Sequence, residues 1–212
     1  MTTDATTVCI PWRGQPDRIG AHQRVTDFWK HFGYPIVHAD SGPGPFHLGK
    51  ARNKAVRKAK TDTVIIADAD AIPDIAAITQ AVDNPDGVTY PHNQYRHIPP
   101  AWVDESDLMA APVDHYYVNS TGGAMITNTD TYWALGGMDE LMHPVWGYED
   151  SAFHLVAQTL SKVKRIPAIL FSFNHAVDGG RDMSSNNPNK TRYTLYQAAR
   201  GRPDLMRELI RR

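Results

Sequence analysis

The sequence predicts an α/β fold, a single-domain sandwich of helices around a central mixed, mostly parallel sheet. Short runs rich in β-branched residues alternate with segments of helical periodicity, as in strands joined by crossover helices. The clearest strand is residues 63–67, whose continuous apolar run is typical of a strand buried on both faces. A chain of 212 residues, of which 42% are hydrophobic and 21% charged, suits one hydrophobic core. We therefore expect one domain over residues 1–212.

The first half of the chain predicts four strands and three helices. Ile19, Val25, Phe28, Trp29 and Phe32 have the spacing of an apolar stripe on the first helix. The glycines and prolines of residues 41–45 predict a loop. The expected strands are residues 6–11, 34–38, 63–67 and 87–90, and the expected helices are residues 17–32, 49–60 and 73 to about 82.

The second half is less regular. Residues 91–113 contain Pro99-Pro100 and Pro112 with little periodicity, so we expect a long irregular excursion. Glycines at Gly122-Gly123 interrupt one expected strand, and Gly201 and Pro203 should divide the tail into two helices. The expected strands are 116–127 and 163–173, and the expected helices are about 130–135, about 148–160 and two within 190–212. The chain thus divides at about 1–90, about 114–193 and the C-terminal helices 190–212.

Charge and cysteine content narrow the function classes. The chain carries 22 Lys and Arg against 23 Asp and Glu, so no global field attracts it to nucleic acid or an anionic membrane. Cys9 lies in an apolar run and should be a small buried hydrophobe. The sequence shows no run of about 18 apolar residues and no signal-peptide pattern at its start. The simplest expectation is a cytoplasmic protein with no membrane partner.

Asp68-Ala69-Asp70 directly follows the clearest predicted strand. Open α/β sheets bind ligands at the carboxyl ends of their strands. In an extended chain, residues two apart share a face, so both carboxylates could meet at one point. Two carboxylates with pKa values near 4 repel each other at pH 7, and Mg²⁺ or Mn²⁺ would relieve the repulsion. The alternative is that both are turn-forming aspartates at a strand end.

Glu149 and Asp150 open a predicted helix within the sequence Trp146-Gly147-Tyr148-Glu149-Asp150. As acids in a first helical turn they could simply complement the helix dipole. Alternatively, one of them could be a general base that takes a proton from an acceptor. Trp146 could be either a wall of a sugar site or a core tryptophan.

Three further features could belong to the same site. His175, after the last predicted strand, could be a third ligand of Mn²⁺ or a structural histidine. Gly122-Gly123 could allow close approach of a ligand or form an ordinary bulge. The basic residues of the helix predicted at 49–60 suggest a solvated face, and the alternative is a track for a polyanionic acceptor.

These motifs, in this order, resemble those of the GT-A glycosyltransferases, more closely the catalytic domains of β-1,4-galactosyltransferases and polypeptide N-acetylgalactosaminyltransferases. The resemblance implies the Rossmann-like GT-A fold of nucleotide-diphospho-sugar transferases. Lacking the secretory anchor and disulfide of the animal enzymes, the sequence is more similar to a bacterial or viral relative. The resemblance covers about residues 8–193, and it is carried by Ile10-Pro11-Trp12-Arg13, Lys50-Ala51-Arg52-Asn53, Asp68-Ala69-Asp70-Ala71-Ile72-Pro73, Gly122-Gly123-Ala124, Trp146-Gly147-Tyr148-Glu149-Asp150 and Asn174-His175.

The resemblance implies a metal-dependent transfer of a sugar from a UDP-sugar, or another nucleoside-diphosphate sugar, to an acceptor hydroxyl. It implies Mn²⁺ (or Mg²⁺) bound by Asp70 and His175 with Asp68 in support, and inversion with Asp150 as general base and Glu149 as an orienting group. Residues 1–90 would bind the donor, and about 114–193 would supply the acceptor and catalytic half. The donor contacts implied by the resemblance are Pro11, Trp12, Arg13, Asp40, Asn53, Asp68, Ala69, Asp70, Gly122, Gly123 and Trp146.

Several properties stay open at this point. The loop before Glu149 is one glycine shorter than the family motif, so the donor sugar is not specified. The acceptor could be a protein, a polysaccharide or a hydroxymethylated DNA base, and the oligomeric state is open. A metal-dependent nucleotidyltransferase or phosphohydrolase is an alternative, although residues 6–14 contain neither a Gly-rich phosphate loop nor a nucleophilic Asp. A non-catalytic sugar-binding module is another, with little use for the Glu149-Asp150 pair.

Overall fold

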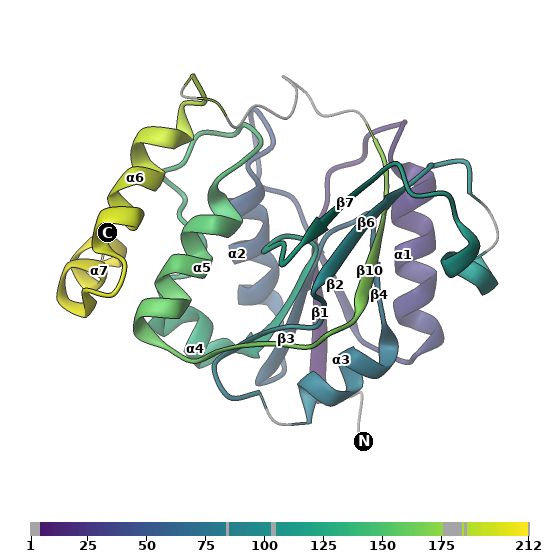
Figure 1. The fold of residues 1–212 in the computed structure, drawn as a ribbon, viewed down its shortest axis with the longest axis horizontal. Coiled ribbons are helices and arrows are strands. Elements are labelled where there is room, and N and C mark those ends of the chain that lie inside the picture. The colour runs from purple at the N-terminus through teal and green to yellow at the C-terminus, as the bar shows by residue number, and fades with distance from the viewer. Residues whose placement is uncertain (1–4, 84, 103–104, 176–183, 185, 212) are drawn as a thin grey trace.

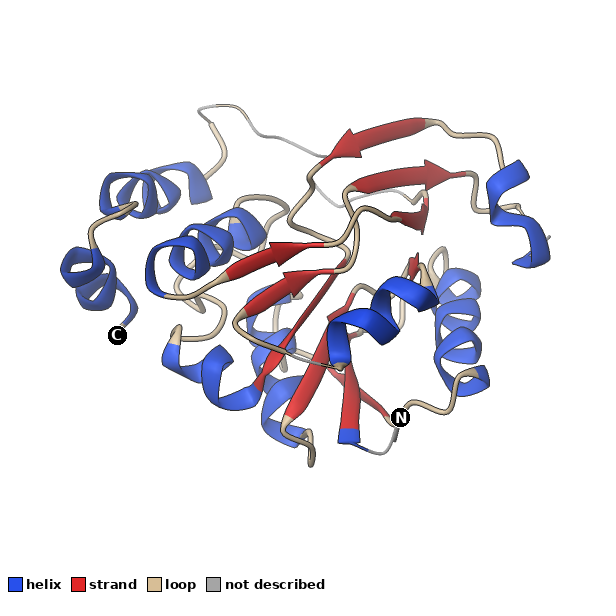
Figure 2. Ribbon diagram, turned by 60° about the horizontal axis from the view of Figure 1, so that its bottom comes forward, coloured by secondary structure: helices blue, strands red, loops and turns tan. Residues whose placement is uncertain are grey.

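The structure, a computed structural model, describes residues 5–83, 85–102, 105–175, 184 and 186–211. Strands lie in the middle of the molecule and helices lie to either side of them (Figure 1, Figure 2). The predicted α/β class is confirmed.

The larger sheet is mixed and mostly parallel, as predicted. Its order is β2-β1-β3-β8-β5-β9. The pairs β1–β2, β1–β3 and β5–β9 are parallel, whereas β8 is antiparallel to both β3 and β5. Only β8 therefore runs against the other strands. The bounds are β1 Thr6–Pro11, β2 Ile36–Ala39, β3 Thr63–Ala67, β5 Val88–Tyr90, β8 Ala124–Asn128 and β9 Val163–Arg165.

A second sheet, in the order β4-β10-β6-β7, was not predicted as such. The strand expected at 116–127 is two strands, β7 and β8, in different sheets, because the chain turns at Gly122-Gly123 between them. The strand expected at 163–173 is also two, β9 and β10, with Pro167, which has no N–H to donate, between them. The excursion expected at 91–113 contains β6 and a 3₁₀ helix at Glu105–Ala110. The bounds are β4 Ala71–Pro73, β6 Gln94–Ile98, β7 His115–Val118 and β10 Ile169–Phe173.

The predicted helices all form, with two corrections. The helix expected from Pro73 begins at Ile75, because Pro73 ends β4 and Asp74 caps the helix by accepting from the backbone N–H groups of Ala76 and Ala77. Ile19 is 55% exposed and does not join the apolar stripe of the first helix. The bounds are α1 Ile19–His31, α2 Leu48–Lys58, α3 Ile75–Val82, α4 Thr129–Ala134, α5 Glu149–Leu160, α6 Asn189–Ala199 and α7 Pro203–Ile210.

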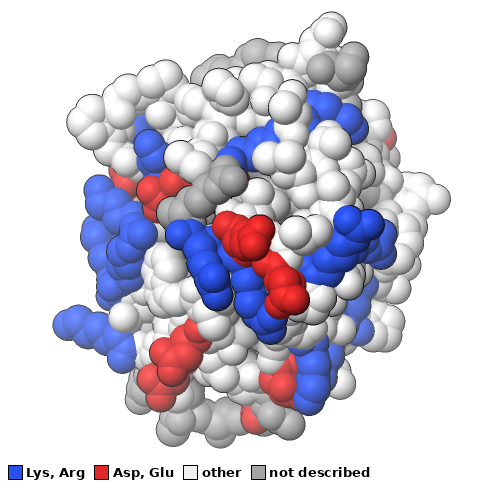
Figure 3. Space-filling view, turned by 90° about the vertical axis from the view of Figure 1, so that its left-hand side faces the viewer, with Lys and Arg blue, Asp and Glu red and all other residues white. Residues whose placement is uncertain are grey.

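Among the described residues, no helix combines the length and apolarity needed to cross a bilayer. Figure 3 views the side on which α6 and α7 lie, and there basic side chains lie next to acidic ones.

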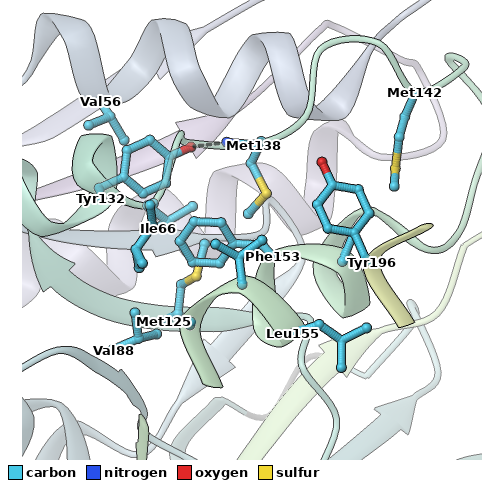
Figure 4. Close-up of a cluster of buried hydrophobic side chains, with 14 of the residues drawn as sticks. Val56, Ile66, Val88, Met125, Tyr132, Met138, Met142, Phe153, Leu155 and Tyr196 are labelled. Carbon is cyan, nitrogen blue, oxygen red and sulfur yellow. Dashed lines mark hydrogen bonds between the residues drawn. The ribbon is translucent and has the colours of Figure 1, made fainter. Parts of the chain in front are cut away.

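Hydrophobic clusters cover both faces of the larger sheet. Alternate residues of β3 point to opposite faces, so Val64 and Ile66 belong to one cluster and Ile65 and Ala67 to the other. The first cluster packs the sheet against α2, α4 and α5, and it also contains side chains from α6 and α7. Figure 4 shows part of this cluster, including Tyr132 of α4, Phe153 of α5 and Tyr196 of α6. The second packs it against α1, α3 and the second sheet. Cys9 is buried in the first cluster, as predicted, and burial raises its pKa to about 12.

Candidate active site

The carboxyl end of β3 holds Asp68 against Gly123. The backbone N–H of Asp68 donates to the carbonyl of Gly123 at 2.8 Å, and the N–H of Gly123 donates to Asp68 Oδ2 at 3.1 Å. Gly123 has a φ of +93°, and a Cβ there would lie 2.6 Å from a ring carbon of Tyr95. Both the backbone conformation and the available space therefore require glycine at this position.

The second sheet brings Asp70 to His175. In the β4–β10 ladder Ala71 pairs with Ser172, and the N–H of Phe173 donates to the carbonyl of Asp70 at 2.9 Å. This register places Nε2 of His175 2.8 Å from Oδ2 of Asp70. The Asp70 side chain is 7% exposed. Although burial acts to raise its pKa, the hydrogen bond from His175 and the charge of Arg18 hold the pKa of Asp70 below its ordinary value.

Asp68 and Asp70 do not converge on one point, which corrects the expectation from their spacing. The rule that residues two apart share a face holds for an extended chain. Here the chain turns after β3, with the N–H of Ala71 donating to the carbonyl of Asp68 at 3.3 Å. Asp70 therefore faces His175, while Asp68 faces Arg52.

Asp70 and His175 fit a divalent metal ion. A carboxylate oxygen and an imidazole nitrogen are ligands that Mn²⁺ accepts. With bonds of about 2.1 Å, two adjacent ligands of one ion stand about 3 Å apart, and the 2.8 Å between Nε2 and Oδ2 agrees with this. Within the described part of the chain, no group of three His, Cys, Asp or Glu side chains gathers at one point. The structure therefore presents a two-residue pair and does not bring the three predicted ligands together.

Arg52 lies buried between Asp68 and Asp150. Its Nη2 donates to Asp68 Oδ1 at 2.6 Å, and its Nη1 donates to Asp150 Oδ1. The Arg52 side chain is 3% exposed, and those of Asp68 and Asp150 are 21% and 20% exposed. The guanidinium thus joins the end of β3 to the start of α5.

The burial of Arg52 corrects the prediction that the basic residues of this helix form a solvated face. The prediction holds for its exposed neighbours, Lys54 and Lys58 among them. Arg52 differs because it precedes Val56 by four residues and so lies on the apolar face of α2, which is packed toward the sheet. That position on the helix is the sequence signal that could have identified it.

Glu149 and Asp150 begin α5, as predicted, and their protons are held unusually tightly. Burial raises the pKa of Glu149 to about 7, with a further contribution from the charge of Asp150. Burial raises the pKa of Asp150 to about 6 against the opposing charge of Arg52. Oε2 of Glu149 is buried and has no hydrogen-bond partner among the described residues. Carboxyl groups that titrate near neutrality suit general acid–base chemistry.

Gly122 leaves the space beside one oxygen of Asp150 without a side chain. A Cβ at Gly122 would lie 3.1 Å from Asp150 Oδ2, so a side chain there would crowd that atom. Gly122 therefore lies beside the carboxylate of Asp150, and Gly123 donates a hydrogen bond to the carboxylate of Asp68. The sequence had predicted that a ligand approaches closely at these glycines, and this stays a prediction.

The ends of β1 and β2 form a neighbouring part of the same sheet edge. Because β1 pairs in parallel with both β2 and β3, the residues that follow these three strands lie along one edge. Arg13 Nε donates to Asp40 Oδ2 at 2.8 Å, and its guanidinium also donates to the carbonyl of Gly44 at 2.6 Å. The Arg13 hydrogen bond holds the pKa of Asp40 well below its usual range. Trp12, which follows Pro11, stacks on His22 with 3.9 Å between ring centroids.

Asn53 lies away from this edge in a buried hydrogen-bond network. Its Nδ2 donates to the Met138 carbonyl at 2.9 Å and to Glu140 Oε1 at 2.8 Å. Its Oδ1 accepts from Tyr132 Oη at 2.6 Å and from the N–H of Met138 at 2.9 Å. With 2% exposure, Asn53 holds the loop after α4 in place. Its predicted contact with a donor stays a prediction.

Trp146 is 38% exposed, so the alternative of a core tryptophan is wrong. Its carbonyl accepts from Asn187 Nδ2 at 2.9 Å.

Arg18 is a site residue that sequence reasoning missed, with its Nη2 3.5 Å from Asp70 Oδ2. No motif marked Arg18, because its proximity to Asp70 depends on how α1 packs beside β4.

The mixed α/β fold with its central mixed sheet matches the fold of solved GT-A glycosyltransferases. Among solved structures, a Drosophila β-1,4-galactosyltransferase 7 mutant in complex with manganese, UDP-Gal and xylobiose is similar, with a TM-score of 0.60 and 16% identity over 89% of this chain and 78% of that one. The catalytic domain of the same Drosophila enzyme with xylobiose has a TM-score of 0.58, with 16% identity over 89% and 79% of the two chains.

A bacterial structure is similar to the same extent. Staphylococcus aureus TarS in complex with UDP-GlcNAc has a TM-score of 0.61 and 9% identity, over 97% of this chain and 70% of that one. No family model matches the chain, and no curated protein matches its sequence. At these identities the likeness shows the fold, and function has to be argued from the site.

Proposed function

We propose that this protein is a metal-dependent glycosyltransferase that moves a sugar from a nucleoside-diphosphate sugar to an acceptor hydroxyl. The observation that carries the proposal is the arrangement at the carboxyl edge of the sheet. Asp70 and His175, the proposed metal ligands, lie in contact with each other, and Asp150, the proposed base, is joined to Asp68 through Arg52. Open α/β sheets bind ligands at this edge.

In this proposal Asp70 and His175 hold Mn²⁺ or Mg²⁺. A bound ion of this kind would neutralise charge on a leaving diphosphate. Arg18, 3.5 Å from Asp70, adds a positive charge beside the same position. Manganese together with UDP-Gal in the Drosophila structure supports this assignment by analogy.

The donor is proposed to be a UDP-sugar, whose nucleoside would lie along the ends of β1 and β2. Trp12 and the Arg13–Asp40 pair form this part of the edge. Two structures of the same fold contain UDP-Gal and UDP-GlcNAc, respectively, which supports a uridine diphosphate donor. The donor sugar would then lie toward Gly122, Gly123 and Trp146.

Asp150 is proposed as the general base, with inversion at the anomeric carbon. The acceptor oxygen would form a bond to the anomeric carbon while the bond from that carbon to the diphosphate oxygen breaks. UDP leaves with the electron pair of that bond, and the acceptor proton passes to Asp150. Because the pKa of Asp150 is raised to about 6, its carboxylate is ionised at neutral pH yet basic enough to accept a proton. Glu149 would orient the acceptor or the sugar.

The acceptor needs a free hydroxyl, which a protein, a polysaccharide or a hydroxymethylated DNA base can all supply. The exposed basic residues of α2 are a candidate track for a polyanion, and Arg57 among them is paired with Glu140 at 3.4 Å. On the side viewed in Figure 3, basic and acidic side chains are mixed, which does not favour a polyanion there. Salt-sensitive binding to DNA would support the third acceptor class.

Product analysis tests the proposal against its two alternatives. The protein would be incubated with Mn²⁺ and either UDP-Gal or UDP-GlcNAc, with and without xylobiose. A glycosyltransferase releases UDP together with a glycoside, or with free sugar when water is the acceptor. A phosphohydrolase releases UMP and a sugar phosphate, and a sugar-binding module releases nothing. We expect UDP, at a rate that Asp150→Asn lowers by about 10² to 10⁴; UMP as the product, or an unchanged rate in Asp150→Asn, would contradict the proposal.

A further inference from the structure

Building on the proposed function, we propose that Arg52 is a positioning residue for the general base. Its guanidinium binds Oδ1 of Asp150, and this leaves Oδ2 as the atom that takes the acceptor proton. In this role Arg52 acts on the reaction through Asp150.

The hydrogen bonds of Arg52 determine which oxygen of Asp150 is available. Nη1 of Arg52 donates to Asp150 Oδ1, whereas no hydrogen bond between described residues reaches Oδ2. Oδ2 lies against Gly122, where a side chain is absent. One oxygen is therefore held inside the protein, and the other is left open toward the Gly122-Gly123 segment.

Asp68 in turn joins Arg52 to the end of β3. Nη2 of Arg52 donates to Asp68 Oδ1 at 2.6 Å, and Asp68 Oδ2 accepts from the N–H of Gly123 at 3.1 Å. Asp68 directly follows β3, the third strand of the larger sheet. Through Arg52, the proposed base Asp150 on α5 is thus held in a fixed position relative to Asp68 at the sheet edge. Asp68 is only two residues from Asp70. A planar guanidinium can bridge two carboxylates in a set geometry, and a lysine ammonium cannot reproduce it.

Packing alone does not account for Arg52. The residues three and four positions further along the same helix face, Ala55 and Val56, are buried and apolar, so an apolar residue would suit this position. Buried ion pairs often contribute no more to stability than well-packed apolar residues. In addition, Nε of Arg52 and Oε2 of Glu149 are both buried without hydrogen-bond partners in the described structure. Unsatisfied buried polar groups are unfavourable and rare, and a catalytic role is one reason for which a protein retains them.

The test compares Arg52→Lys and Arg52→Ala with Arg207→Ala, a control on α7 whose side chain is 52% exposed. UDP release from UDP-Gal or UDP-GlcNAc with Mn²⁺ would be measured for each. Arg52→Lys should lower kcat by about 10² while the KM for the donor is unchanged. Added guanidinium ion should restore part of the rate in Arg52→Ala and none in Asp150→Asn. Arg207→Ala should match the wild type.

A double variant shows whether Arg52 acts through Asp150. Adding Arg52→Lys to Asp150→Asn should cause no further loss of kcat, because the group being positioned is already gone. A further loss equal to that in the wild-type background would overturn the inference, as would wild-type turnover by Arg52→Lys. Thermal unfolding of each variant separates loss of folding from loss of positioning, and if Arg52→Ala does not fold, Arg52→Lys, which keeps the charge, carries the test. Absence of UDP release by the wild type would instead defeat the proposed function.

Discussion

Nε2 of His175 lies 2.8 Å from Oδ2 of Asp70, and the pairing of β4 with β10 sets this distance. Asp70 immediately precedes β4, and His175 follows β10 by two residues. In an antiparallel ladder such positions come together at the same end. The candidate metal ligands are therefore placed by the second sheet, which the sequence did not predict.

Gly122→Ala should reduce turnover without unfolding the protein. The new methyl group would lie 3.1 Å from Asp150 Oδ2, where the acceptor hydroxyl is proposed to approach. Displacement of reacting groups by about 1 Å can cost about 10² in rate, so we expect UDP release to fall by about 10- to 100-fold. Gly20→Ala is the control, because a Cβ there meets no atom within 4 Å. A helical Gly20→Ala should keep full activity and gain about 0.5 to 1 kcal/mol of stability. Wild-type turnover in Gly122→Ala would argue against the proposed approach to Oδ2.

Glu149 should make the free energy of unfolding depend on pH. Its pKa is raised from 4.5 to about 7 in the folded protein, so the folded state holds this proton more tightly than the unfolded state. The contribution is fully favourable below the unfolded pKa of 4.5 and is lost as the pH rises toward 7, by at most about 3 kcal/mol. Urea unfolding without metal at about pH 5 and about pH 8 would show that Glu149→Gln loses less stability over this range than the wild type. Equal losses in the two proteins would contradict the raised pKa.

Asn53→Ala should lower stability and leave donor affinity unchanged. The substitution removes all four hydrogen bonds that Asn53 makes with Tyr132 of α4 and with Met138 and Glu140 after it, and it leaves the buried O–H of Tyr132 without its acceptor. We expect a loss of about 3 kcal/mol in the free energy of unfolding. Lys54→Ala, at the exposed neighbouring position, should change neither quantity. Calorimetric titration with UDP and Mn²⁺ distinguishes the roles, since a weakened Kd in folded Asn53→Ala would indicate the donor contact implied by the resemblance.

The larger sheet was predictable because its strands carry a local signal. β1 and β3 are apolar on both faces, and helices of clear periodicity separate them. β6 has no such signal, since Arg96 and His97 interrupt any apolar pattern over its five residues. Whether the chain continues as a strand or crosses to the other sheet at Pro167 depends on tertiary contacts, which periodicity does not report.

The candidate site was predictable only in part for the same reason. The location of Asp68 and Asp70 after a buried strand follows from the order of the elements. Their separate partners do not, because these depend on the turn at Ala69-Asp70 and on the β4–β10 register. The burial of Arg52 depends on carboxylates supplied from β3 and α5, and composition alone classifies an arginine in a basic helix as solvated.

Binding of UDP in the presence of Mn²⁺ tests the central proposal most directly. A ligand at 100 times its Kd should stabilise the folded protein by about 2.7 kcal/mol, which a thermal unfolding shift or calorimetric titration detects. We predict that Mn²⁺ and UDP together stabilise the wild type and His31→Ala, which removes an exposed histidine of α1. The stabilisation should disappear in Asp70→Ala and His175→Ala. Undiminished, Mn²⁺-dependent binding of UDP by Asp70→Ala would show that the Asp70–His175 pair is not the metal site.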